Sequence, residues 1–417
     1  MSDIENDEKK ISRRDIFGLG SAALAAATLT MAGETTADAQ QRASHTAPNE
    51  INPGQQNGPL AAENPDSEWP APTDNGSVKP FKYSFSLSRK RLESGGWTRQ
   101  VTVRDLPIST AIAGVEMRLT AGGVRELHWH VEAEWAIMLY GSARITAVDQ
   151  EGRSFVSDVS KGDLWLFPPG VPHSIQGLSP DGCKVLLVFD NGNFDEFHTF
   201  LITDWLSHTP KEVLAKNFDV PQSTFEAVPK KELFIFQTAL PGDLQAEQAE
   251  AAKGTGTVPK RYDFKASAMK PTKVTRGGEV KIVDSKTFPV TPISAAIVTL
   301  KPGGLRELHW HPNADEWQYY ITGKGRMTVF AAASTARTMD FEEGDVGYIP
   351  ISNPHYIENT GDSDLVFIEM FKSGEYQDIS LAEWMAHTPH LLVNQHLGVT
   401  MSMLDSIPKE EAVVTPL

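Results

Sequence analysis

The chain has one cysteine, Cys183, no excess of basic residues and no long hydrophobic run beyond its first forty residues. A single cysteine excludes an intramolecular disulfide and a thiolate metal cluster. The formal net charge of −16 argues against a nucleic-acid or anionic-membrane binder, because either partner would require a basic patch. Without a long apolar stretch, the mature chain is not expected to insert into a membrane.

The remaining composition is that of a folded protein. Of the 417 residues, 40% are hydrophobic and 22% charged, which excludes disorder over most of the length and predicts two or three domains. Glycine and proline are abundant, with 32 and 27 residues, as expected for a β-rich fold with frequent turns.

The first 39 residues have the pattern of a twin-arginine signal peptide. Arg13-Arg14 is followed by a weakly apolar stretch, and Ala37-Asp38-Ala39 is a small-residue cleavage signal. We therefore expect export by the twin-arginine route to the periplasm or the medium. Because this route carries folded proteins, its use hints that a metal is loaded before export.

The rest of the chain is a duplication. The six residues Arg125–His130 recur identically as Arg306–His311, and further matches follow in the same order, among them Pro172-His173 with Pro354-His355. A period this long indicates two tandem domains rather than a solenoid. We predict an N-terminal arm and two domains around a linker, with the bounds 40–79 for the arm, 80–225 for domain one, 226–261 for the linker and 262–417 for domain two.

Short apolar runs alternate with turns in each copy, which predicts a mainly β fold of antiparallel strands in a sandwich or barrel. The runs in the first copy are Ala111–Leu119, Trp135–Tyr140, Ser142–Val148, Leu164–Phe167 and Lys184–Phe189. Each copy ends in a helical segment, at 204–218 and 381–397. The Thr-Pro pairs at 209–210 and 388–389 should break or restart these helices.

Each copy carries a set of three histidines and one glutamate. Two histidines separated by one residue point to the same face of a strand, and a tight hairpin would bring the glutamate beside them. Three imidazoles and a carboxylate suit Mn, Fe, Co, Ni or Zn, and one of the two sites could be purely structural. The predicted metal ligands are His128, His130, Glu134 and His173 in the first copy and His309, His311, Glu316 and His355 in the second.

An arginine lies three residues before the first histidine of each set, at Arg125 and Arg306. The odd spacing places it off the ligand face of a regular strand, although a strand end or a twist could bring its guanidinium to the edge of the metal. There it could hold a carboxylate by a forked contact. The alternative interpretation is a salt bridge at the rim.

These spacings resemble the cupin family. The cupin motif G-x5-H-x-H-x3,4-E-x6-G fits Gly122–Gly141 and Gly303–Gly323, and the second motif fits with departures at Gly177 and Ser352, neither of which is a ligand. Two such domains in tandem resemble the bicupin oxalate decarboxylases over residues 45–417. The resemblance implies two double-stranded β-helix (jelly-roll) barrels, each with a short C-terminal helical segment. It also implies a homo-hexamer in which each N-terminal arm packs on the other domain.

The resemblance further implies a manganese-dependent conversion of oxalate to formate and carbon dioxide, with manganese in both domains and dioxygen as co-catalyst. In the family a mobile lid, often Ser-Glu-Asn-Ser-Thr, carries a glutamate that moves a proton. Here Glu196 and Thr199 match this pattern, whereas Asp195, Phe197 and His198 depart from it. The alternatives are an oxalate oxidase that produces hydrogen peroxide and a metal-binding bicupin without turnover.

The second domain has a shorter counterpart of the lid and an additional acid, Glu369, at the position of Leu187 in the first copy. In the family, an acid at this position has been considered as a proton donor at the second site. A structural role beside the metal ligands is the other interpretation of Glu369.

Overall fold

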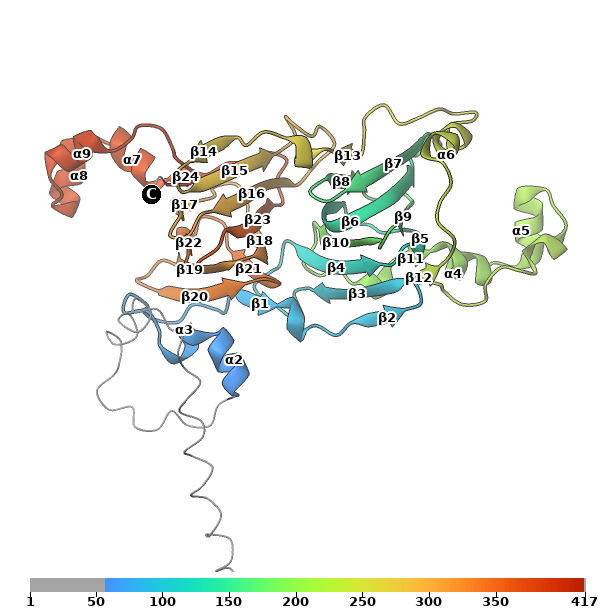
Figure 1. Ribbon diagram of the computed structural model, residues 1–417, viewed down its shortest axis with the longest axis horizontal. Helices are drawn as coiled ribbons and strands as arrows, with labels where there is room; N and C mark the ends of the chain where they lie inside the picture. Colours follow the sequence, from blue (N-terminus) through green and yellow to red (C-terminus); the bar gives the residue numbers. More distant parts are fainter. Residues whose placement is uncertain (1–56, 416–417) are drawn as a thin grey trace, which may run out of the picture. The chain divides into compact units, whose positions relative to one another are not determined.

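The computed structural model describes residues 57–415, so the segment 1–39, predicted to be a signal peptide, lies outside the described residues. Residues 62–415 lie in one compact unit that contains two antiparallel β-barrels (Figure 1). The prediction of a mainly β protein with two tandem jelly-roll domains is confirmed.

The first barrel has one strand that passes through both of its sheets. β6 pairs through its first half with β8 and β10 and through its second half with β7 and β9. The chain bends between the halves at Gly141, where φ is 70° and an added Cβ would lie 1.9 Å from the Gly182 carbonyl oxygen. The strands are β2 (Arg91–Glu93), β3 (Gly96–Val101), β4 (Ala113–Leu119), β5 (Gly123–Trp129), β6 (Glu134–Val148), β7 (Ser154–Ser160), β8 (Leu164–Phe167), β9 (His173–Gly177), β10 (Cys183–Phe189), β11 (Phe200–Leu201) and β12 (Ile235–Gln237).

The second barrel repeats this architecture, with its sheets ordered β1-β21-β18-β23-β16-β15-β14 and β20-β19-β22-β17-β24. Gly323, with φ of 88°, separates β18 from β19 and takes the position of Gly141. The strands are β14 (Lys273–Thr275), β15 (Gly278–Val283), β16 (Ser294–Leu300), β17 (Leu305–Trp310), β18 (Glu316–Thr322), β19 (Lys324–Phe330), β20 (Ala336–Glu342), β21 (Asp345–Ile349), β22 (His355–Asn359), β23 (Leu365–Phe371) and β24 (Ile379–Ser380).

The strand that leads into each barrel pairs with the other barrel. β1 (Lys82–Ser84) pairs with β21 of the second barrel, and β13 (Asp263–Phe264) pairs with β8 of the first. The domain boundaries predicted at 80 and 262 thus each lie just before a strand that pairs with the other barrel. Sequence patterns identify a strand but not its partner, because pairing across a domain boundary leaves no local signal.

Two predicted connections carry more structure than expected. Within the arm lie the short helices α2 (Gly58–Glu63) and α3 (Pro65–Glu68). The predicted linker 226–261 contains β12, which pairs with β5, and α6 (Leu244–Ala251), which packs on β7. Arg144 of β6 fixes α6 by an ion pair with Glu247, with 2.7 Å between Nη1 and Oε2. Two parts of this segment thus belong to the first barrel.

The two barrels share a buried core and a buried polar contact. Trp135 and Leu166 of the first barrel lie in one hydrophobic cluster with Trp317 and Ile368 of the second. Beside it, the fully buried Glu116 accepts a hydrogen bond from the Tyr319 hydroxyl of the other barrel at 2.5 Å. A continuous apolar core fixes the two barrels as one folding unit.

The predicted helical segments are present and break at the Thr-Pro pairs. α4 (Ile202–Ser207) and α5 (Lys211–Phe218) follow the first barrel, and α7 (Leu381–His387), α8 (His390–Leu397) and α9 (Met401–Ser406) follow the second. The Ser380 hydroxyl caps α7 by accepting a hydrogen bond from the Glu383 amide. Among the described residues, no helix is both long and apolar enough to cross a membrane.

Two candidate metal centres

The first barrel brings its four predicted ligands to one point. His128 lies in β5, His130 follows the end of that strand, Glu134 begins β6 and His173 begins β9. All four side chains are buried, and their ligand atoms lie within 4.8 Å of one another. The short turn between β5 and β6, which do not pair with each other, and the register of His128 with His173 create this cluster.

The second barrel forms the same cluster from His309, His311, Glu316 and His355. His309 lies opposite His355 in the pairing of β17 with β22, and Glu316 begins β18. Residues 57–415 therefore contain two separate centres of three imidazoles and one carboxylate, as the sequence predicted.

Backbone carbonyl groups orient the imidazole rings in both centres. In the first, His128 Nδ1 lies 2.7 Å from the Glu126 carbonyl oxygen and His173 Nδ1 lies 2.7 Å from that of Val171. In the second, His311 Nδ1 lies 2.7 Å from the Gln377 carbonyl oxygen. A carbonyl can only accept, so each Nδ1 carries the proton and each Nε2 presents a lone pair to the centre.

The charge state of the ligands is the one that a metal requires. Burial alone would raise the pKa of Glu134, but the neighbouring His173 and His130 lower it to about 2. Burial, Arg125 and the other imidazoles hold the pKa of His128 well below its usual range. At neutral pH the centre therefore offers a neutral imidazole and an anionic carboxylate as ligands.

The donor set fits a divalent cation. In the second centre, His355 Nε2 and Glu316 Oε2 lie 2.8 Å apart, and both atoms are buried without a hydrogen-bond partner. With the proton on Nδ1, two lone pairs face each other at that distance. A cation between them would remove the repulsion, and the mixture of imidazole and carboxylate donors suits Mn, Fe, Co, Ni or Zn.

A β-bulge brings each predicted arginine to the ligand face. The register of β5 with β9 shifts between Arg125 and His128, so that Arg125 and Glu126 are both buried and Leu127 is 49% exposed. β17 shifts in the same way between Arg306 and His309. The bulge adds one residue to the strand, which converts the odd spacing into an inward-facing position.

Arg125 is the cation beside the first centre, and its direct hydrogen-bond partners are uncharged. Its Nη1 donates to the Phe234 carbonyl oxygen at 3.1 Å, its Nη2 donates to Thr199 Oγ1 at 2.9 Å, and its guanidinium lies 4.1 Å from the Phe234 ring centre. Burial lowers the pKa of Arg125 to about 10, although Glu196 and Glu134 oppose this shift. Arg125 is thus still cationic at neutral pH.

The predicted lid closes over the same centre. Glu196 begins a short 3-10 helix, η2 (Glu196–His198), and is only 5% exposed. Burial raises the pKa of Glu196, while the Thr98 hydroxyl and the Arg125 guanidinium oppose the rise. A carboxyl group with a raised pKa beside a buried arginine can both accept and return a proton.

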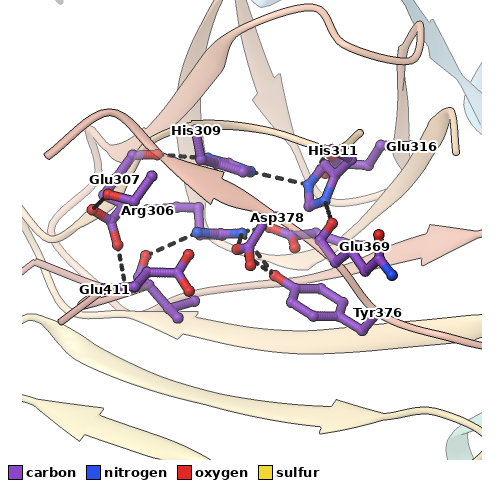
Figure 2. Close-up of polar contacts among 12 residues, drawn as sticks. Arg306, Glu307, His309, His311, Glu316, Glu369, Tyr376, Asp378 and Glu411 are labelled. Atoms are coloured by element: carbon purple, nitrogen blue, oxygen red, sulfur yellow. Dashed lines mark hydrogen bonds and ion pairs between the residues drawn. The ribbon is translucent and has the colours of Figure 1, made fainter. Parts of the chain in front are cut away.

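Arg306 differs, because the chain itself supplies anions to it (Figure 2). Its Nε donates to Glu369 Oε1 at 3.1 Å, and its Nη2 donates to Asp378 Oδ2 and the Tyr376 hydroxyl, each at 2.8 Å. Its Nη1 donates to the Val413 carbonyl oxygen at 3.2 Å. Asp378 takes the place that Thr199 occupies in the first barrel, so this arginine is already neutralised.

Glu369 is placed to hold Arg306 rather than to face solvent. It is fully buried, and burial raises its pKa to about 7 against the opposing effect of Arg306. The predicted roles of Glu369 and Arg306 in catalysis stay predictions. The geometry gives both residues a structural part in one buried charge network.

Two glutamates that attach a closing segment to each barrel were not predicted from the sequence. The Glu126 carboxylate accepts hydrogen bonds from the Phe234 amide at 2.6 Å, and the Glu307 carboxylate accepts one from the Val413 amide at 2.5 Å. Both glutamates belong to the repeated six-residue segment, so their repetition was the available signal. Asp378 carried no such signal, because Thr199 holds the matching position in the first copy, whereas Glu411 is repeated as Glu232.

A pH effect on stability follows from the Glu411 carboxyl group, which lies beside Asp378 (Figure 2). Burial and the Asp378 carboxylate raise the pKa of Glu411 to about 8 from its ordinary 4.5. The folded chain then binds one proton more than the unfolded chain between these values. Stability from this group is therefore lost as pH rises through that window, by at most about 1.4 kcal/mol per pH unit.

Glu411→Gln keeps a neutral polar group at this position at every pH. We expect the thermal midpoint of the variant to fall less than that of the wild type between pH 5 and pH 8. Glu410→Gln, at the exposed neighbouring position, is the matched control and should leave the pH dependence unchanged. Parallel curves for the wild type and Glu411→Gln would contradict the assignment.

Two jelly-roll barrels, each enclosing three imidazoles and one carboxylate, define a two-domain metalloprotein of the cupin class. The cupin family model matches residues 85–225 and 264–403. The chain belongs to the cupin family and, within it, to the bicupin oxalate decarboxylases.

Known relatives place the chain in this group along most of its length. The chain is 51% identical to oxalate decarboxylase OxdC of Bacillus subtilis over 350 residues, which cover 84% of this chain and 90% of the relative. It is 42% identical to a probable oxalate decarboxylase of Arthroderma benhamiae over 87% of this chain and 89% of the relative. A solved structure from work on the Mn(II) centres of the Bacillus subtilis enzyme superimposes with a TM-score of 0.85, at 50% identity, covering 87% of this chain and 96% of that one.

Proposed function

We propose that this chain is a manganese-dependent oxalate decarboxylase that converts oxalate to formate and carbon dioxide, with dioxygen as co-catalyst. The carrying observation is the buried pair of Arg125 and Glu196 beside the first centre. Relatives named for this activity and a related structure with Mn(II) centres support the assignment. Manganese in both centres would give two ions per chain.

The first barrel supplies an anion site and a proton carrier. Arg125 would hold one carboxylate of oxalate by a forked contact, since its guanidinium is cationic and its protein acceptors are uncharged. Glu196 would accept the proton of the hydrogen oxalate ion. As the C–C bond breaks and carbon dioxide leaves, Glu196 would return the proton to the remaining carbon, which completes the C–H bond of formate.

The residues around the metal would exclude water from these reaction steps. The four ligands, Arg125 and Glu196 are all at most 5% exposed when the lid is closed, so bulk water cannot compete for the proton. When bound, the metal would supply a Lewis acid and a one-electron redox partner. The second centre would hold a metal without taking a carboxylate substrate, because Arg306 is neutralised.

An oxalate oxidase is the second candidate, because the lid departs from the family pattern. Asp195, Phe197 and His198 depart from the family pattern in the segment that determines the fate of the proton. A test of both candidates follows formate and hydrogen peroxide together in mature protein reconstituted with Mn²⁺ and supplied with oxalate and air. One formate per oxalate consumed would support the decarboxylase, peroxide would favour the oxidase, and neither product with metal bound would favour a non-catalytic bicupin.

Because the two centres have separate ligands, we expect each to bind its metal ion independently of the other. His128→Ala should lower the manganese content from two ions to one per chain by removing a ligand of the first centre. His309→Ala should do the same at the second. Metal analysis after gel filtration measures this, with His208→Ala, an exposed histidine, as the control. Loss of both ions in either variant would contradict independent centres.

We also propose export by the twin-arginine route and assembly into a homo-oligomer, a hexamer by family resemblance. Arg13-Arg14 and the cleavage signal at 37–39 support export to the periplasm or the medium. Two exposed tryptophans support association through the helices that follow each barrel. They are Trp205 in α4, which is 64% exposed, and Trp384 in α7, which is 59% exposed. Cell fractionation and analytical ultracentrifugation test the two points.

A further inference from the structure

Of the three lid residues that depart from the family pattern, only the first, Asp195, is buried. Phe197 and His198 point outward, with Phe197 61% exposed, whereas Asp195 is only 8% exposed. A buried carboxylate requires hydrogen-bond donors or a cation to compensate for its lost hydration. Asp195 has both kinds of partner.

Asp195 connects the lid to the barrel wall. One carboxylate oxygen accepts hydrogen bonds from the Phe197 amide at 3.1 Å, which caps η2, and from Gln100 Nε2 at 3.4 Å. The other accepts from Arg104 Nη1 at 2.8 Å. Gln100 also reaches the catalytic position, because its Oε1 accepts the Glu196 amide hydrogen at 3.1 Å.

The residues that receive the lid are themselves fixed. Gln100 lies in β3, and Arg104 lies in the loop that follows this strand. In that loop the Val103 amide donates to the Gly192 carbonyl oxygen at 2.8 Å, and the Arg104 amide donates to the Thr102 hydroxyl at 3.2 Å. An opening movement of the lid would therefore have to break the contacts of Asp195 while β3 stays in place.

The far end of the lid is held by a separate set of contacts. Thr199 Oγ1 donates to the Glu196 carbonyl oxygen at 3.0 Å and accepts from Arg125 Nη2. Glu196 thus lies between two attachment points, one at Arg125 and one at Asp195. Loss of either would let the segment rotate away from the metal centre.

We propose that Asp195, Arg104 and Gln100, named here the lid anchor, position Glu196 over the first centre and thereby favour formate over peroxide. The inference rests on the proposed function. With the anchor intact, Glu196 returns its proton to carbon and formate leaves. With Glu196 out of reach, oxalate loses two electrons to dioxygen, and two carbon dioxide molecules and one hydrogen peroxide result, with two protons taken from solvent.

Three variants test the lid anchor in the manganese-loaded protein. Asp195→Ala removes the helix cap and both barrel contacts, Arg104→Gln removes the ion pair alone, and Arg104→Lys restores a cation. We expect Asp195→Ala to raise the ratio of peroxide to formate about fivefold, the population change that loss of one cap produces. Arg104→Gln should raise the ratio about twofold, because an ion pair with an exposed arginine contributes little, and Arg104→Lys should return it toward the wild-type value.

Hydrogen exchange at the Glu196 and Phe197 amides gives a readout that does not depend on turnover. It should accelerate in Asp195→Ala by the same factor as the change in product ratio. Arg153→Gln is the control, since Arg153 forms a comparable ion pair with Asp149 outside the lid, with 2.7 Å between Nε and Oδ2. It should change neither quantity.

The outcomes separate this inference from the proposed function. Unchanged exchange in Asp195→Ala would overturn the anchor, and faster exchange with an unchanged product ratio would overturn its effect on the reaction. If the wild type produced neither formate nor peroxide, the proposed function would fail. The exchange experiment would then still decide whether Asp195 holds the lid closed.

Discussion

Glu196→Gln is expected to reduce formate production by about 10²–10⁴-fold, the usual contribution of a positioned acid–base group. Glutamine preserves the size and polarity of the side chain but cannot take up or return a proton. Steady-state formate production by the manganese-loaded protein measures the effect. The loss should lie in kcat rather than in KM, because Arg125 still binds the substrate.

The raised pKa of Glu196 suits this side chain to carry a proton. Burial favours the neutral carboxyl group, so the proton-carrying form persists to a higher pH than that of an exposed glutamate. Glu212→Gln, on the exposed surface of α5, is the matched control and should retain full activity. Wild-type formate production by Glu196→Gln, with two manganese ions bound, would remove Glu196 from the mechanism and direct the search for the proton carrier elsewhere.

Arg306→Met is expected to lower the free energy of unfolding by about 3–5 kcal/mol, the loss observed when one partner of a buried ion pair is removed. Glu369 and Asp378 would remain buried beside each other without the guanidinium that now holds both. Chemical denaturation of the manganese-loaded protein at pH 7 measures the loss. The loss should shrink as the pH falls, because the pKa of Glu369, already about 7, rises further without Arg306 and a protonated Glu369 is no longer a stranded charge.

Arg125→Met provides the contrasting variant. Arg125 contacts a carbonyl oxygen and a hydroxyl group rather than carboxylates, so its removal strands no directly bonded anion and should destabilise the protein less than Arg306→Met. Its effect should appear instead as a large loss of kcat/KM for oxalate. Equal destabilisation by the two substitutions would contradict the view that only the second arginine is neutralised by the chain.

The metal ligands were predictable from the sequence for a simple reason. A strand has a period of two residues, so His128 and His130 share a face wherever the strand lies. A short turn then fixes Glu134 beside them, and duplication supplies an independent second example at His309 and His311. Local geometry was sufficient for these side chains, and the structure confirms that each set meets at one point.

Other features depended on contacts that no local pattern records. The position of Arg125 required a bulge in β5, whose cause lies in the pairing with β9. The partners of β1 and β13 lie in the opposite barrel, more than ninety residues away in sequence. Residues 226–261 read as a linker because α6 has few apolar residues, yet Arg144 and Glu247 attach this helix to the barrel.

The sequence by itself determined the two β domains and both ligand sets, because repetition, strand period and motif spacing are properties of the chain alone. The lid glutamate came from the resemblance to the oxalate decarboxylases. Only the tertiary structure decided that the two arginines differ. Arg125 and Arg306 begin identical six-residue segments, but Thr199 contacts the first arginine and Asp378 the second. The charge available to a substrate depends on which side chains fold against the guanidinium, and these come from segments about seventy residues along the chain.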